Sequence, residues 1–230
     1  MPASGPDGLD WLVNWGTIAQ FGQGLGLTCL IALVSAGLSM VLGTGFGFLL
    51  AAKSIVVRGL ARVYLEAVRI VPLVVMLYLG YYVAAADFGL NITNVACSIV
   101  VFTVWGTGEF GDIVRGAITT ISRHQYESGR ALGLTTVQLY VRVIVPQSVR
   151  RVAPAAINLI TRMVKTTSLC SFITVAEVMT VGRQVISVAN QSFRHPEAPF
   201  AVYTLVMALY FLICWPISIG AKKLERVWAS

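Results

Sequence analysis

The chain has 230 residues, of which 57% are hydrophobic and 12% charged, with a mean hydropathy of +0.78. Soluble domains average about 25% charged residues, so this composition excludes an ordinary soluble globular domain. The net charge of +7 would suggest a nucleic-acid partner in a soluble protein, but in a membrane protein it reports topology. We therefore expect no nucleic acid, and the length suits five or six spanning helices of about 20 residues each.

The N-terminal part is expected to be a tail or interfacial helix, residues 1–20, in which Trp and apolar residues recur at helical spacing (Trp11, Leu12, Trp15, Ile18). No Lys or Arg precedes the first apolar run, so the tail is a poor signal peptide. The first span is predicted from about Gly24 to Ala52. Its small residues either let helices approach closely or belong to a glycine-tolerant helix: Gly37, Ser39, Gly43, Gly45 and Gly47.

Two further spans are predicted over residues 64–86 and 95–113, separated by a loop without positive charge. Near the start of the first, Glu66 and Arg69 are one helical turn apart and are able to pair. The second ends with three charged residues, again at turn spacing: Glu109, Asp112 and Arg115.

A basic loop over residues 115–152 is predicted to hold two short helices. The first ends near Ala131, and Gly133 marks the break. Thr135 is positioned to cap the second helix, which Pro146 is expected to stop.

The fourth span is predicted to start near Pro154, to be interrupted by Arg162, Lys165 and a Thr-Thr-Ser cluster, and to continue to about Val181. A loop over residues 182–199 follows. The fifth span covers about 200–220, so residues 21–220 form one five-span domain with a tail at 221–230.

The distribution of Lys and Arg sets the orientation of these five spans. Twelve lie in the segments 53–62, 115–151 and 221–230, whereas the other side holds two, both in the loop 182–199. The positive-inside rule therefore places the N-terminus outside and the basic loop and C-terminus in the cytoplasm.

Motifs for chemistry on this chain are missing from the sequence. The four cysteines lie scattered in apolar runs, as buried inert thiols do, and form no metal-binding cluster (Cys29, Cys97, Cys170, Cys214). No GxxxxGK[ST] loop, GxSxG or HExxH is present, so we expect no bound nucleotide, no metal and no enzyme activity on this chain.

The basic loop resembles the EAA loop of the permease subunits of bacterial ABC importers, with Glu127 and Gly133 in register and Pro146 near the expected spacing. The resemblance extends over about residues 21–228 and is closest to the polar amino acid permeases. It includes Tyr64-x-Glu66-x-x-Arg69-x-x-Pro72-Leu73, Pro146-Gln147, Lys165-Thr166-Thr167-Ser168-Leu169 and Leu224-Glu225-Arg226. Glu127-Ser128-Gly129 departs from E-A-A, and Thr166 stands where Asp is usual.

This resemblance implies an all-α type I importer permease in the bacterial inner membrane. Its implied partners are two ABC ATPase subunits that bind ATP and Mg, a second permease, identical or homologous, and a periplasmic substrate-binding protein. The residues implied to couple to the ATPase are Arg123, Gln125, Glu127, Gly129, Arg130, Ala131, Gly133 and Pro146. The loop arginines either contact the ATPase or only enforce topology and touch lipid headgroups.

The expected cargo is a polar, first of all cationic, amino acid or opine, with neutral and acidic amino acids as alternatives. Charges at membrane depth are costly and tend to face a cavity or a partner. On this ground the candidate substrate-binding residues are Arg69, Lys165, Thr166, Thr167, Ser168 and Glu177. The alternative for the charged ones is that they pair within the bundle. The alternative functions are an ATP-independent carrier or channel and a scaffold without a transport role.

Overall fold

The computed structural model describes residues 12, 14–89, 91–193 and 195–229, which form only helices and their connections. The predicted all-α membrane fold is thereby confirmed. The elements, in chain order, are α1 (Trp15–Leu50), α2 (Ile55–Ile70), α3 (Leu73–Tyr78), the π-helical turn η1 (Leu79–Val83), α4 (Ala84–Phe88), α5 (Asn94–Thr119), α6 (Arg123–Ala131), α7 (Thr136–Leu139), the π-helical turn η2 (Tyr140–Ile144), α8 (Val145–Thr166), the 3₁₀ helix η3 (Thr167–Ile173), α9 (Val178–Val188), the π-helical turn η4 (Ala189–Phe193) and α10 (Ala198–Ala229).

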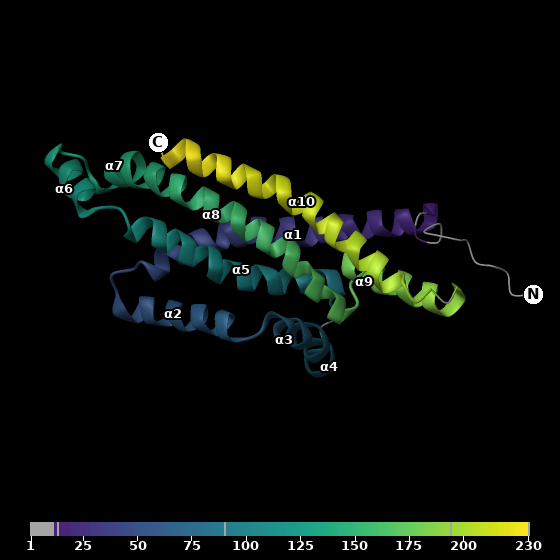
Figure 1. The fold of residues 1–230 in the computed structure, drawn as a ribbon. Coiled ribbons are helices and arrows are strands. Elements are labelled where there is room, and N and C mark those ends of the chain that lie inside the picture. Colours follow the sequence, from purple (N-terminus) through teal and green to yellow (C-terminus); the bar gives the residue numbers. More distant parts are fainter. Residues whose placement is uncertain (1–11, 13, 90, 194, 230) are drawn as a thin grey trace, which may run out of the picture.

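Three of the described helices, α1, α5 and α10, are long and apolar enough to cross a membrane. Two bent pairs raise the number of candidate spans to five if each pair is one span. The long helices run side by side in an elongated bundle, with α2 along one flank (Figure 1). In this bundle α5 packs against α1, α2 and α8, and the fully buried Phe102 of α5 lies in the main hydrophobic core.

Small residues bring α1 and α5 into close contact. A Cβ atom added at Gly47 would lie 2.7 Å from the Cβ of Val114, and one at Gly43 would lie 3.0 Å from the Cβ of Phe110. Gly45, on the other side of α1, has open space around it. Close helix packing therefore explains only some of the small residues of this span.

The second predicted span is sharply bent. The axes of α2 and of the helix from Leu73 to Val83 differ by 96°. Pro72 lies at this break with extended backbone, as does Val71 before it. Proline disfavours the helical conformation of the residue before it, so the chain turns here.

Two expectations for the later spans were wrong. Pro146 does not stop a helix, because the chain passes through η2 directly into α8, with Pro146 in its first turn. A π-helical turn is a common way for a helix to continue past such a disturbance of its hydrogen bonds. The predicted loop 182–199 is also mostly helical, since α9 and η4 extend to Phe193.

The N-terminal boundary differs as well. Helix α1 begins at Trp15, so the residues from Trp15 onward belong to the first long helix and form no separate interfacial helix. Trp11 and the rest of residues 1–11 lie outside the described residues.

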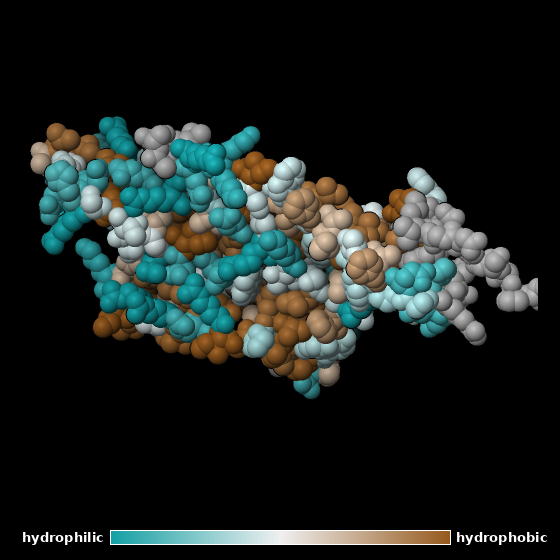
Figure 2. Space-filling view, viewed as in Figure 1, coloured by the Kyte–Doolittle hydropathy of each residue, from teal (hydrophilic) through white to brown (hydrophobic). Residues whose placement is uncertain are grey.

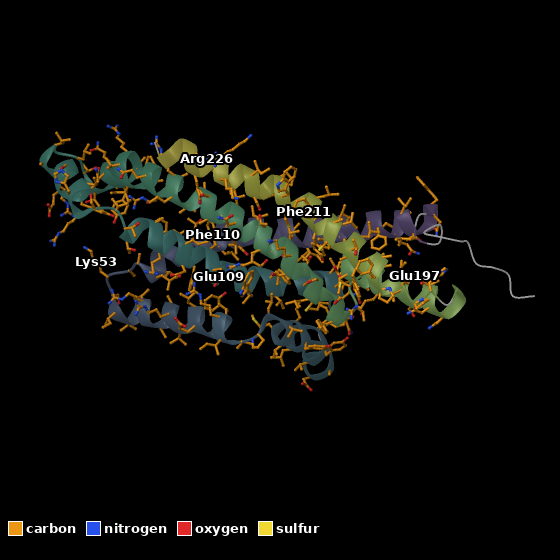
Figure 3. All side chains as sticks on the ribbon, viewed as in Figure 1. Lys53, Glu109, Phe110, Glu197, Phe211 and Arg226 are labelled. Atoms are coloured by element: carbon orange, nitrogen blue, oxygen red, sulfur yellow. The ribbon has the colours of Figure 1, made fainter. Side chains whose placement is uncertain are left out.

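The basic segments gather at one end of the bundle. Figure 3 places Lys53 and Arg226 at the end that carries α6 and α7, and Glu197 toward the opposite end. Figure 2 shows hydrophilic residues over the α6–α7 end and in a band along the bundle, between hydrophobic patches. The fold thus joins three segments that are far apart in the sequence into one basic end.

Candidate functional site

A cluster of charged side chains joins α2, α5 and α8 on one side of the bundle. Arg69, in the last turn of α2, contacts two carboxylates of α5: its Nε lies 2.9 Å from Oε1 of Glu109, and its Nη2 lies 2.8 Å from Oδ2 of Asp112. Arg162 of α8 also pairs with Glu109, and Arg115 pairs with Asp112 at 2.7 Å. Three arginines therefore share two carboxylates, which leaves the charged cluster one positive charge in excess.

A pocket of about 380 Å³ is lined by Asn158, by apolar residues of α5 and α8, and by four members of the charged cluster, Arg69, Glu109, Asp112 and Arg162. The guanidinium of Arg162 stacks over Trp105, 4.9 Å from the ring centroid, and its side chain is 51% exposed. Glu109, at 13% exposure, lies deeper. The pocket thus presents guanidinium groups at its surface and holds them in place with carboxylates beneath.

The predicted pairing of Glu66 with Arg69 was wrong. Arg69 binds Glu109 and Asp112 on another helix, and the side chain of Glu66 is exposed. Two acceptors on α5 compete better than one at the surface of α2, where an i,i+3 pair contributes little. The signal that sequence reasoning underused was the turn spacing of the three charges at the end of α5, residues 109–115.

The structure places the predicted polar cluster at the junction of α8 and η3. Lys165 is exposed, whereas Thr167 is fully buried. Three hydroxyl groups, those of Thr166, Thr167 and Ser168, donate to backbone carbonyls of the preceding turn. Of the residues of this polar cluster, Lys165 alone presents a charge to the outside, and it is not part of the lining of the charged pocket.

Glu177 is fully buried at the start of α9, away from the charged cluster. Its carboxylate accepts hydrogen bonds from the backbone N–H groups of Met179 and Thr180, both at 2.8 Å, and from the hydroxyl of Tyr210 at 3.1 Å. It therefore caps α9 at the point where the chain bends by 51° after η3. Its predicted contact with substrate stays a prediction, and this geometry gives it a structural part.

Helix α6 lies at the basic end, as the sequence predicted. Arg123 and Glu127 pair along its outer face at 3.3 Å, and both are exposed. Gln125 faces inward and accepts a hydrogen bond from the amide of Gln147 on α8, at 3.3 Å. Burial, with a smaller contribution from Tyr140, raises the pKa of the Tyr126 hydroxyl, which therefore stays neutral.

Two glycines shape the turn between α6 and α7. Gly129 is buried, and a Cβ atom there would lie 2.4 Å from Cδ1 of Leu139. Gly133 has φ of 77°, a conformation that favours glycine. Thr135 then caps α7 in a full capping box with Gln138, which confirms the predicted start of that helix.

The tip of this turn exposes apolar surface that the sequence did not single out. Leu132 is 81% exposed and Val137 is 72% exposed, beside the exposed Arg130 and Ala131. Pro146, in the first turn of α8, is also exposed.

Relatives with similar sequences are transport permeases. The chain is 27% identical to the probable glutamine ABC transporter permease protein GlnP of Bacillus subtilis, over 90% of this chain and 93% of that protein. It is 28% identical to the nopaline transport system permease protein NocM of Agrobacterium fabrum, over 83% of this chain and 80% of that protein. It is also 28% identical to the glutamine transport system permease protein GlnP of Escherichia coli, over 94% and 96%.

Solved structures share the fold. A chain in the crystal structure of an amino acid ABC transporter with histidines matches 95% of this chain, over 99% of its own length, with a TM-score of 0.83 at 24% identity. A chain of the inward-facing MetNI methionine ABC transporter matches 94%, over 99% of its own length, with a TM-score of 0.74 at 17% identity. The family model described as "binding-protein-dependent transport system inner membrane component" matches residues 43–224. The chain therefore belongs to this family of membrane-spanning transport components.

Proposed function

We propose that this chain is the membrane-spanning permease subunit of an ATP-driven importer for polar amino acids or opines. Family membership and the glutamine and nopaline permeases among its relatives support the substrate class. The observation that carries the coupling to an ATPase is the position of α6, which lies at the basic end with exposed charged residues and is followed by the exposed Leu132. ATP and Mg would bind to the separate ATPase.

The proposed assembly contains two ATPase subunits, a second permease that is identical or homologous, and a periplasmic binding protein that delivers the amino acid. We place the N-terminus in the periplasm and the C-terminus in the cytoplasm. The common end shared by the three basic segments of the chain supports this orientation, because positive charge collects on the cytoplasmic side.

In this proposal α6 docks in a groove of the ATPase. Glu127, Arg130 and Leu132 are exposed for that contact, and a helix in a groove is a common mode of recognition. Gly129 and Gly133 act indirectly, since they set how α6 packs on α7 and how the chain leaves it. ATP drives transport because the ATPase binds α6 differently in its open and closed states.

The pocket of the charged cluster is the proposed place where substrate passes. Its exposed guanidinium groups, on Arg162 and Arg69, suit the carboxylate that every amino acid and opine carries. Lys165, one turn after Arg162 on α8, is a further exposed cation. Among the proposed substrate contacts, Glu177 alone would favour a substrate with a cationic side chain. An uptake screen over amino acids and opines decides whether the importer has this preference.

The experiment reconstitutes the chain with its ATPase and binding protein in vesicles. Gly133→Arg and Glu127→Arg should lower uptake and substrate-stimulated ATP hydrolysis about tenfold, as loss of about 1.4 kcal/mol of docking energy would. Glu225→Arg is the matched control, because Glu225 is exposed on α10 near the same end. Unchanged rates in both variants would refute docking through α6, and uptake without any ATPase would refute the importer in favour of a carrier or channel.

A further inference from the structure

An apolar pocket of about 340 Å³ lies between α1, α5 and α8, near their basic end. Its walls include Phe48 of α1, Val114 of α5 and Val152 of α8. On α8 the lining residues Ser148, Val152 and Ala156 repeat at four-residue spacing, whereas Asn158 and Arg162 line the charged pocket. The apolar pocket therefore opens on a different face of α8 from the proposed substrate path.

A second pocket of about 450 Å³ continues the first toward the basic end. The two share Phe48, Ile118 and Tyr140, and the second adds Lys53 and Tyr126. The surface thus changes from apolar to polar and positive along the bundle. From Tyr140 at the start of η2 to Ala156 in α8 the helix rises about 24 Å at 1.5 Å per residue. That length exceeds one half of a hydrocarbon core of about 30 Å.

The apolar pocket contains one polar group without a partner. Ser148 is 8% exposed, and among the described residues its Oγ atom has no hydrogen-bond partner. A buried hydroxyl without a partner is costly, and serine in a helix commonly bonds to a carbonyl of the preceding turn. This hydroxyl is free to donate to an acceptor that enters the pocket.

The polar mouth is built for an anion. Lys53 is exposed and has no carboxylate partner among the described residues. The next residue, Ser54, is the N-cap of α2 but makes no side-chain capping bond, so the first N–H groups of this 16-residue helix are available near Lys53. A helix N-terminus beside a lysine favours a phosphate group.

We propose that the two joined pockets bind one anionic glycerophospholipid of the surrounding membrane. An acyl chain fills the apolar pocket, an ester carbonyl of the glycerol accepts the hydrogen bond of Ser148, and the phosphate lies beside Lys53. Tyr126 of α6 lines the phosphate end and stacks edge-on against Tyr140, so the lipid touches the proposed coupling helix directly. The site requires only that the chain spans the membrane, so it stands apart from the proposed transport function.

Native mass spectrometry of the full chain, purified with the partners that accompany it, tests this site. The protein is exchanged into nanodiscs that contain equal amounts of phosphatidylglycerol and phosphatidylcholine. We expect the wild type to retain one phosphatidylglycerol in preference to phosphatidylcholine. Lys53→Gln should lower that retention about fivefold, the contribution of one basic residue near an anionic lipid. Arg62→Gln, which removes an exposed charge two turns into α2 and outside both pockets, should leave it unchanged.

A second pair of variants tests the apolar pocket. Ala153→Trp fills it and should abolish retention of the lipid, whereas Val41→Trp, at a position of α1 that is 73% exposed and outside the lining, should not. Equal retention by wild type and Ala153→Trp, or equal effects of Lys53→Gln and Arg62→Gln, would overturn the proposal. A disulfide between two copies of the Val149→Cys variant would also overturn the proposal, because a second copy of the chain would then cover the face that carries the apolar pocket.

Discussion

The most informative perturbation of the charged cluster is Glu109→Gln. The substitution keeps the size of the side chain and removes the charge that holds both Arg69 and Arg162. Asp112 still binds Arg69, so the cluster is weakened rather than dispersed. The change therefore isolates the carboxylate that connects α2, α5 and α8.

The expected magnitude follows from exposure. The side chain of Glu109 is 13% exposed, but its partners Arg69 and Arg162 are 38% and 51% exposed. Each pair therefore falls near the surface value of about 1 kcal/mol. The two pairs together predict a loss of about 2 kcal/mol in the free energy of unfolding. Removing one partner of a fully buried ion pair costs more, roughly 3–5 kcal/mol. For a chain of this size the predicted loss lowers the unfolding midpoint by about 4–8 °C.

The assay is thermal unfolding of the purified protein in one fixed detergent–lipid mixture. Glu66→Gln is the matched control, because Glu66 is exposed on the same turn of α2 as Arg69, and it should leave the midpoint unchanged. A double-mutant cycle of Glu109→Gln with Arg162→Gln should give a coupling energy of about 1 kcal/mol. Equal destabilisation by Glu66→Gln, or no coupling to Arg162, would refute the assignment of these ion pairs.

Two further predictions concern the packing and the bend of the bundle. Gly47→Val should destabilise the protein by about 1–3 kcal/mol, because its Cβ would meet Val114 at 2.7 Å, whereas Gly45→Val, in open space, should be close to neutral in the same unfolding assay. Glu177→Ala should lower the free energy of unfolding by about 1–2 kcal/mol, because α9 loses its cap. It should also speed hydrogen exchange of the amides in the first turn of α9, whereas Tyr210→Phe should change that exchange less. Slow exchange in Glu177→Ala would contradict the capping role.

The sequence by itself determined the class of the protein and its local structure. Apolar runs long enough to cross a bilayer cannot be covered in a soluble domain of this composition, and three of the described helices, with two bent pairs, are long and apolar enough to cross a membrane. The turn around Gly133 and the cap at Thr135 were also predictable, because a left-handed turn and a capping box depend on residues within a few positions of each other.

The tertiary structure alone decided which faces meet. Arg69 turns to Glu109, forty positions along the chain, rather than to Glu66 one turn away. Gly47 packs against α5 while Gly45, of the same type and only two positions earlier, does not. The free hydroxyl of Ser148 likewise has meaning only because α1 and α5 enclose a pocket around it. In each case the partner depends on the rotation of one helix against another, and that rotation is set by the packing of the whole bundle rather than by nearby residues.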